Sequence, residues 1–113
     1  MTSSAQLDQL LKETARGLKE IFGDALDSVI LYGSYARGEQ TAESDVDVMA
    51  KLNLSAEEIS SYRRRVSALA SELGLRYDVL LSVKLQEKEK FDRYFHVLPF
   101  YQNVARDGVV ISA

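Results

Sequence analysis

The sequence predicts an α/β (α+β) fold, in which helices flank a mixed β-sheet in the order α-β-β-α-β-α-β. Two segments carry apolar residues at helical spacing, and several short runs rich in β-branched residues lie between them. Such alternation is typical of a sheet with helices packed on it. A chain of 113 residues is long enough for one hydrophobic core, so we expect a single domain over residues 1–113.

The first half of the chain predicts a helix and two strands. The helix is expected to end near Gly23, because its apolar stripe stops there: Leu7, Leu10, Leu11, Leu18, Ile21 and Phe22. Residues 27–33 form an almost continuous apolar run, typical of a strand buried on both faces. Residues 45–52 alternate with period two and predict a second strand. Since only a loop separates these strands, we expect them to pair antiparallel.

The second half predicts a helix, a strand, a helical segment and a last strand. Ser55 and Glu58 have the spacing of a capping box, and the helix that they open is expected to end at Gly74. The remaining elements are a third strand at 75–83, a helical segment at 85–106 that restarts at a proline, and a strand at 109–112.

Composition excludes several classes of function. The 14 Lys and Arg against 17 Asp and Glu give a net charge of −3, which argues against general nucleic-acid binding. The chain has 0 cysteines, so disulfides, thiolate metal sites and cysteine nucleophiles are excluded. No apolar run approaches the ~20 residues of a membrane-spanning helix, and the N-terminus does not resemble a signal peptide. We expect a cytoplasmic protein without membrane attachment, and a homo-oligomer stays open.

Asp45 and Asp47 predict a site for a divalent cation. On a strand their side chains face the same side, roughly 6.6–6.8 Å apart along the backbone. Two such charges about 4 Å apart repel each other by about 4 kcal/mol at an effective dielectric constant near 20. A cation between them reverses this effect. Oxygen ligands without a nearby histidine or cysteine favour Mg²⁺, with Mn²⁺ as the alternative.

The turn that begins at Gly33 predicts a phosphate site. Glycine allows a sharp turn at the end of the first strand, and a short helical turn after it would leave free N–H groups for an anion. Ser34 adds a hydroxyl group, and the guanidinium group of Arg37 can bind two phosphate oxygens. A phosphate site followed by a magnesium site fits a nucleoside triphosphate.

Asp78 supplies a third carboxylate. It interrupts the otherwise apolar third strand, where a charge is costly without a partner. If that strand lies beside the second one, Asp78 joins Asp45 and Asp47, and the three can hold two cations roughly 3.5–4 Å apart. The alternatives are a turn followed by solvated acids and, for Asp78, an edge-strand acid paired with Arg76.

These residues resemble the minimal nucleotidyltransferases (MNT) of the DNA polymerase beta-like superfamily. Two runs carry the resemblance, which extends from about Leu26 to the end: Gly33-Ser34-x-Ala36-Arg37-Gly38 and Ser44-Asp45-x-Asp47, with a later strand aspartate. The resemblance implies the polymerase beta-like nucleotidyltransferase fold and a Mg²⁺-bound nucleoside triphosphate, which we expect to be ATP. A nucleoside monophosphate would be transferred, and pyrophosphate would leave.

The resemblance also implies roles for single residues. Gly33 and Ser34 would contact the β- and γ-phosphates, and Arg37 matches the motif arginine. Asp45 and Asp47 would hold the metals. Asp78 would bind the catalytic metal and help to deprotonate the acceptor hydroxyl.

Small MNT proteins of bacteria and archaea are typically partnered with HEPN-domain ribonucleases in toxin–antitoxin pairs. The MNT member is the antitoxin, and it is similar to enzymes that attach AMP to a tyrosine of the toxin. The resemblance therefore implies a protein adenylyltransferase with a HEPN-type toxin as its partner. Two alternatives stay open: a non-catalytic antitoxin that neutralises its partner by binding, and a small-molecule (antibiotic) adenylyltransferase.

Overall fold

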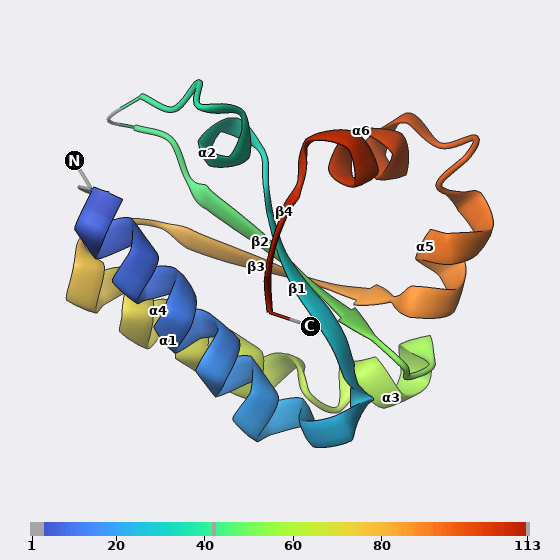
Figure 1. Cartoon of the computed structure of the whole chain (residues 1–113). Coiled ribbons are helices and arrows are strands. Elements are labelled where there is room, and N and C mark those ends of the chain that lie inside the picture. Colours follow the sequence, from blue (N-terminus) through green and yellow to red (C-terminus); the bar gives the residue numbers. More distant parts are fainter. Residues whose placement is uncertain (1–3, 42, 113) are drawn as a thin grey trace.

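The computed structural model describes residues 4–41 and 43–112, which form a four-stranded sheet with helices on both faces (Figure 1). In chain order the elements are α1 (Ser4–Phe22), a 3₁₀ turn η1 (Gly23–Ala25), β1 (Leu26–Tyr32), α2 (Ser34–Arg37), β2 (Val46–Leu52), α3 (Ala56–Ser60), α4 (Arg63–Tyr77), β3 (Leu81–Glu87), α5 (Lys88–Tyr94), α6 (Pro99–Asp107) and β4 (Val109–Ser112). The predicted fold class is confirmed.

The sheet is mixed, with the strand order β3-β2-β1-β4. β1 pairs antiparallel with both β2 and β4, and β2 pairs parallel with β3. The antiparallel pairing of the first two strands follows the prediction from the short loop between them. Parallel strands need a crossover connection, which α3 and α4 provide here.

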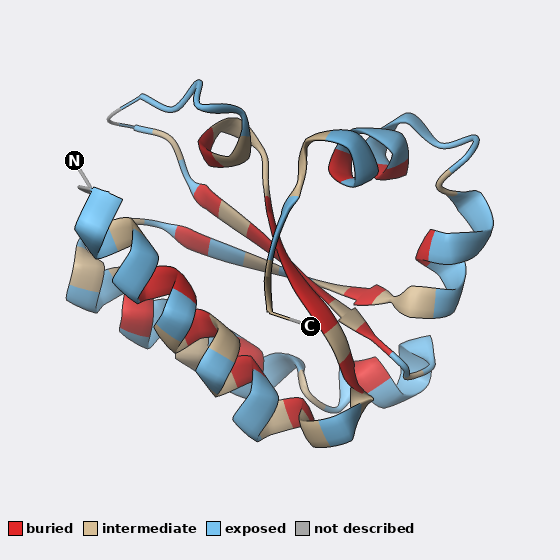
Figure 2. Cartoon of the chain, viewed as in Figure 1, coloured by how far each residue is buried: buried red, intermediate tan, exposed pale blue. Residues whose placement is uncertain are grey.

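The two faces of the sheet pack against different helices. The α1–α4 face contains the larger core, to which β2 contributes Val46, Val48, Ala50 and Leu52. Met49 points to the opposite face, where it packs against Phe91 of α5 and Tyr101 of α6. Figure 2 shows the buried residues along the strands and on the inner sides of α1 and α4. The side chain of Asp47 lies on the same face of the sheet as that of Met49, because side chains alternate along a strand.

The prediction of a strand at 75–83 is wrong at both ends. α4 continues past Gly74 to Tyr77, and Asp78 follows as its C-cap in the left-handed region, with φ 52° and ψ 50°. The Gly74 carbonyl accepts hydrogen bonds from the N–H groups of Asp78 and Val79. A Cβ on Gly74 would lie 2.7 Å from the Val79 carbonyl oxygen. The glycine therefore permits the next loop to fold back closely; it does not end the helix itself.

Contacts with α1 hold the last turn of α4. The Tyr77 hydroxyl donates a hydrogen bond to Glu13, and the Arg76 guanidinium donates to the same carboxylate. These three side chains favour a helix through residue 77, where the sequence alone predicts a strand. β3 consequently begins at Leu81.

Two further boundaries differ from the prediction. β3 extends to Glu87 because its last residues pair with the end of β2, so the next helix begins at Lys88 and not at residue 85. The helix predicted from Ser55 is divided into α3 and α4, although its capping box is present. The Ser55 hydroxyl accepts from the Glu58 N–H at 3.2 Å, and the Glu58 carboxylate accepts from the Ser55 N–H at 3.0 Å.

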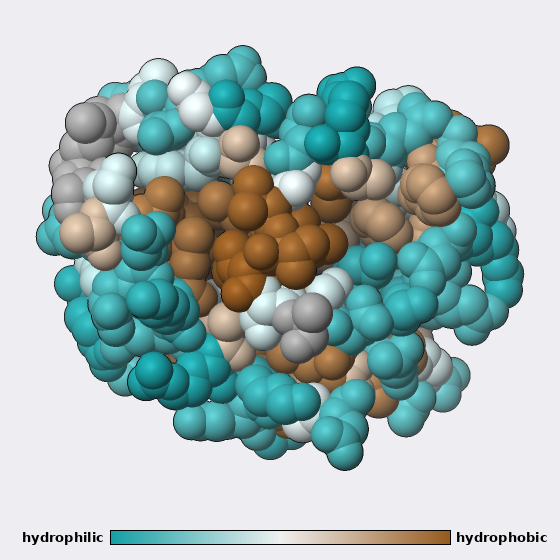
Figure 3. All heavy atoms as spheres, viewed as in Figure 1, coloured by the Kyte–Doolittle hydropathy of each residue, from teal (hydrophilic) through white to brown (hydrophobic). Residues whose placement is uncertain are grey.

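The edge strand β4 lies on an apolar part of the surface. Val109 and Val110 are 48% and 60% exposed, and the face in Figure 3 has an apolar area at its centre, where Figure 1 places β4. β4 has only four residues, and short edge strands limit edge-to-edge association. Among the described residues, no helix is both long enough and apolar enough to cross a membrane.

Candidate active site

The predicted phosphate-binding turn follows the end of β1. Gly33 has φ 77° and ψ −157°, a region that is accessible essentially only to glycine. Its carbonyl accepts a hydrogen bond from the Arg37 N–H at 3.3 Å, and the Ser34 carbonyl accepts from the Glu39 N–H at 2.9 Å. Residues 34–37 thus form the short helical turn α2, whose first N–H groups have no acceptor within the turn.

The carboxylate of Asp47 lies directly against this turn. Asp47 pairs across the sheet with Tyr32, the residue before Gly33. A Cβ atom on Gly33 would lie 2.5 Å from Oδ2 of Asp47, so only a glycine leaves room for the carboxylate. The structure therefore brings the predicted phosphate site and the predicted metal site into contact.

Asp45 and Asp47 influence each other electrostatically. Asp45 is exposed and immediately precedes β2, whereas Asp47 is partly buried. Burial raises the pKa of Asp47, the charge of Asp45 raises it further, and Arg37 lowers it. Burial also raises the pKa of Tyr32, and the charge of Asp47 adds to this effect. A pair of carboxylates that repel each other, with oxygen donors only, fits a hard divalent cation such as Mg²⁺.

A cavity of about 200 Å³ opens beside the turn, between α2 and α6. Arg37 lies at this cavity, and its Nε donates to Glu39 at 2.7 Å. The residues that line the cavity are Tyr32, Gly33, Arg37, Phe100, Asn103, Val104 and Asp107.

Asp78 does not lie with the other two acids. Among the described residues, no three acidic, histidine or cysteine side chains are close enough to hold one metal ion. Asp78 is exposed at the end of α4, where it lines a different hollow of about 550 Å³ together with Gly74, Leu75 and Leu80. The predicted three-carboxylate cluster is therefore not formed in this structure, because Asp78 caps a helix and is not part of β3.

The alternative interpretation of Asp78 is also wrong. Arg76 donates hydrogen bonds to Glu13 and Glu72, each at 3.0 Å, and Asp78 lies at the end of α4 and not on an edge strand.

Comparison with known proteins identifies the family. The model of the nucleotidyltransferase domain family matches residues 11–110. The chain belongs to this family. It is 35% identical over 85 residues to "Putative protein adenylyltransferase MJ0141" of Methanocaldococcus jannaschii, covering 74% of this chain and 82% of that protein. It is 30% identical over 89 residues to the protein adenylyltransferase MntA of Thermococcus cleftensis, covering 76% and 84%.

A solved structure supports the fold. The crystal structure of a toxin-antitoxin with AMP-PNP superposes with a TM-score of 0.58 and 19% identity, covering 88% of this chain and 70% of that chain. The predicted resemblance to nucleotidyltransferases is confirmed, and the chain is a nucleotidyltransferase.

The cavity beside the turn has a wall that sequence reasoning missed. Its residues come from α6, for which the sequence predicts only a helical segment at 85–106. Phe100, Asn103 and Asp107 lie three and four residues apart, so they share one face of α6. This mixed polar and aromatic stripe at helical spacing is the signal that could have identified them.

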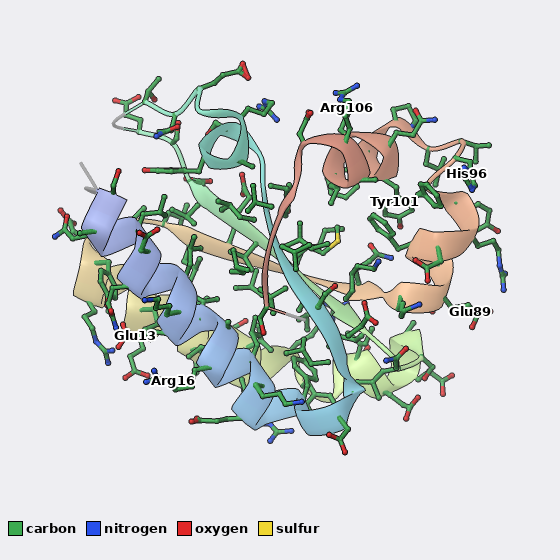
Figure 4. The ribbon with its side chains drawn as sticks, in the orientation of Figure 1. Glu13, Arg16, Glu89, His96, Tyr101 and Arg106 are labelled. Atoms are coloured by element: carbon green, nitrogen blue, oxygen red, sulfur yellow. The ribbon has the colours of Figure 1, made fainter. Side chains whose placement is uncertain are left out.

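The neighbouring strand β3 adds a cation to the same face of the sheet. Ser82 pairs with Asp47, and Lys84 follows on the same side, with Nζ 5.5 Å from the Phe100 ring centroid. The single histidine, His96, lies in the connection between α5 and α6, away from the α2 end of the site (Figure 4). It does not line the cavity.

Replacing Gly33 by alanine should disrupt the metal site. The new Cβ would collide with Asp47, and the backbone strain costs of the order of 1–3 kcal/mol. We expect Mg²⁺ or Mn²⁺ affinity, measured by calorimetry, to fall at least about tenfold. Gly38→Ala is the matched control, because Gly38 also has a positive φ but a Cβ there meets nothing within 4 Å. Equal loss of metal affinity in both variants would contradict a role for the Gly33–Asp47 contact.

Replacing Asp47 by asparagine should stabilise the metal-free protein at neutral pH. A raised pKa means that the folded state favours the protonated carboxyl, so its contribution to stability is lost as the pH rises through the folded-state pKa. Asparagine does not titrate. The melting temperature of Asp47→Asn should therefore exceed that of the unsubstituted protein at pH 7 in a chelator, and the difference should shrink as the pH is lowered. A lower melting temperature at pH 7 would contradict this account.

Proposed function

We propose that this nucleotidyltransferase is a Mg²⁺-dependent protein adenylyltransferase, which transfers AMP from ATP to a hydroxyl group of a partner toxin and thereby acts as its antitoxin. The observation that carries the proposal is the contact between Gly33 and Asp47, which joins the phosphate-binding turn to a pair of carboxylates. The names of the relatives support transfer to protein, and the toxin-antitoxin with AMP-PNP supports a toxin as partner.

Each residue of the motif has a role in this reaction. Gly33 and Ser34 would hold the β- and γ-phosphates at the turn, and the Arg37 guanidinium would pair with their oxygens. Asp45 and Asp47 would hold Mg²⁺, which would neutralise the phosphate charge as it develops. The exposed position of Asp45 leaves the site open to an acceptor on a second, larger protein.

In the proposed transfer, the acceptor hydroxyl oxygen forms a bond to the α-phosphorus of ATP. The bond from this phosphorus to the oxygen that bridges to the β-phosphate breaks, and pyrophosphate leaves with both electrons of that bond. The hydroxyl proton must pass to a base, for which we propose the carboxylate of Asp78.

The pairing of β2 and β3 offers a route that would bring Asp78 closer to Asp45. The Val46 N–H donates to the Leu80 carbonyl at 2.9 Å, so the backbone pairing already extends one residue before β3. Ser82 and Lys84 face the Asp47 side, and Asp78 would share this face in an extended strand. Because Leu81 lies opposite Val46, Asp78 would then lie opposite Glu43, two positions before Asp45. We propose that β3 extends to Asp78 when ATP and metal bind.

The partner that we propose is a HEPN-type toxin. A non-catalytic antitoxin would use the same surface without transfer, and a small-molecule adenylyltransferase would need a pocket for its acceptor. The relatives that are named protein adenylyltransferases favour an acceptor presented by another protein.

Transfer of label from ATP tests the proposed reaction. In host lysate with Mg²⁺, we expect a protein band to acquire label from [α-³²P]ATP and not from [γ-³²P]ATP. Asp45→Asn should abolish labelling. Glu57→Gln is the matched control, because it removes a charge from an exposed acid in α3, beyond the other end of β2, and should leave labelling intact. Toxin neutralisation by Asp45→Asn without labelling would favour the binding alternative.

Asp78→Asn tests the proposed base. Asparagine tolerates the left-handed backbone at this position, so the melting temperature should stay within about 2 °C. Labelling should nevertheless fall by at least about 100-fold, as expected for the loss of a general base. Undiminished labelling would show that Asp78 serves only as the helix cap.

A further inference from the structure

The cavity between α2 and α6 is too small for a whole nucleotide. Pockets that enclose drug-sized ligands measure about 300–1,000 Å³, whereas this one measures about 200 Å³. It can therefore hold one part of ATP, either phosphate groups or the nucleobase. The chemistry of its walls decides between them.

The floor and one wall of the cavity are aromatic and aliphatic. Phe100 is 41% exposed and meets the Tyr32 ring edge-on, with the ring centroids 5.7 Å apart and an interplanar angle of 86°. Val104, the third apolar residue that lines the cavity, is buried. Flat aromatic ligands stack on such surfaces, and phosphate groups gain nothing from them.

The acid in the cavity also disfavours phosphate. Arg106 donates a hydrogen bond to each carboxylate oxygen of Asp107, at 3.0 and 3.1 Å, and these bonds hold the pKa of Asp107 below its usual value. The carboxylate oxygens keep further lone pairs that can accept from the N–H groups of a base, whereas phosphate oxygens have no donor to offer them. Figure 4 shows Arg106 on the outer side of α6, and Arg106 is not among the residues that line the cavity.

Asn103 is the second hydrogen-bonding side chain that α6 contributes to the cavity wall. Arg106 has only donors, so the Asn103 atom that it contacts at 3.1 Å is the oxygen Oδ1. The Asn103 amide N–H₂ group is left as a donor at the cavity. Asn103 and Asp107 lie one helical turn apart, and they present a donor and an acceptor from the same face of α6.

We propose that this cavity receives the nucleobase of the nucleoside triphosphate, with the base against Phe100 and its polar edge toward Asn103 and Asp107. The proposal rests on the proposed function, in which the base is adenine. Arg37 lies at the side of the cavity that borders the phosphate-binding turn. The triphosphate would thus extend from the cavity past Arg37 toward Gly33 and Asp47.

Calorimetric titration with two ligands tests the assignment, because inorganic tripolyphosphate shares the phosphates of AMP-PNP but lacks its base. With Mg²⁺ present, Phe100→Ala should weaken AMP-PNP binding by about 5- to 100-fold, and Asn103→Ala by about 2- to 10-fold. Neither should change tripolyphosphate binding by more than about twofold. Arg37→Ala should weaken both ligands.

Gln102→Ala is the matched control, because Gln102 carries the same amide group on α6 but bonds to the His96 carbonyl and does not line the cavity. Its affinity for both ligands should be unchanged. Asn103 is exposed, so Asn103→Ala keeps the test valid if Phe100→Ala unfolds.

Equal weakening of both ligands by Asn103→Ala would overturn the proposal, since the cavity would then hold phosphates. Unchanged AMP-PNP affinity in both α6 variants would overturn it as well. Selective weakening of AMP-PNP in a protein that transfers no label to any protein would refute the proposed function but leave the base pocket supported. No AMP-PNP binding by the unsubstituted protein would refute both.

Discussion

The contact between the Gly33 backbone and the Asp47 carboxylate is the constraint on which the site depends. It exists because β1 and β2 pair antiparallel with Tyr32 opposite Asp47, so that the turn after β1 returns onto the beginning of β2. The α1–α4 core holds both strands in this register through Val46 and Val48, on the face opposite the acids. A slip of one residue would move Asp47 into that core, where an unpaired charge is costly.

Much of this arrangement follows from local patterns. The continuous apolar run before Gly33 is typical of a strand that is buried on both faces, and the period-two alternation from Asp45 is typical of a strand that is buried on one face. Few other secondary structures fit either pattern, so both strands could be predicted from the sequence. The short loop between them then requires antiparallel pairing. The acids and the turn could therefore be predicted as neighbours from the sequence.

The misplaced elements share a different cause. Gly74 has the appearance of a helix stop, but in the fold its missing side chain admits the Val79 carbonyl. Contacts with Glu13 of α1 hold the helix beyond this local signal, as far as Tyr77. Contacts between residues more than 60 positions apart cannot be read from a local pattern. Phe100 and Asn103 could not be identified for the same reason, because α6 reaches the turn through long-range contacts: the pairing of β4 with β1 and the packing of Tyr101 on Met49.

The path of the chain also has a consequence for biosynthesis. α6 and β4 follow every other described element, and β4 pairs with β1 about 80 positions earlier through Leu31 and Val109. On the ribosome, a nascent chain that ends before α6 would have β1 unpaired along one edge. The cavity beside α2 would also lack the wall that α6 provides. Such long-range closure forms late in folding. In the proposed site, affinity for the nucleotide would consequently be acquired only when α6 and β4 dock, so bound ligand would mark molecules in which this late closure has formed.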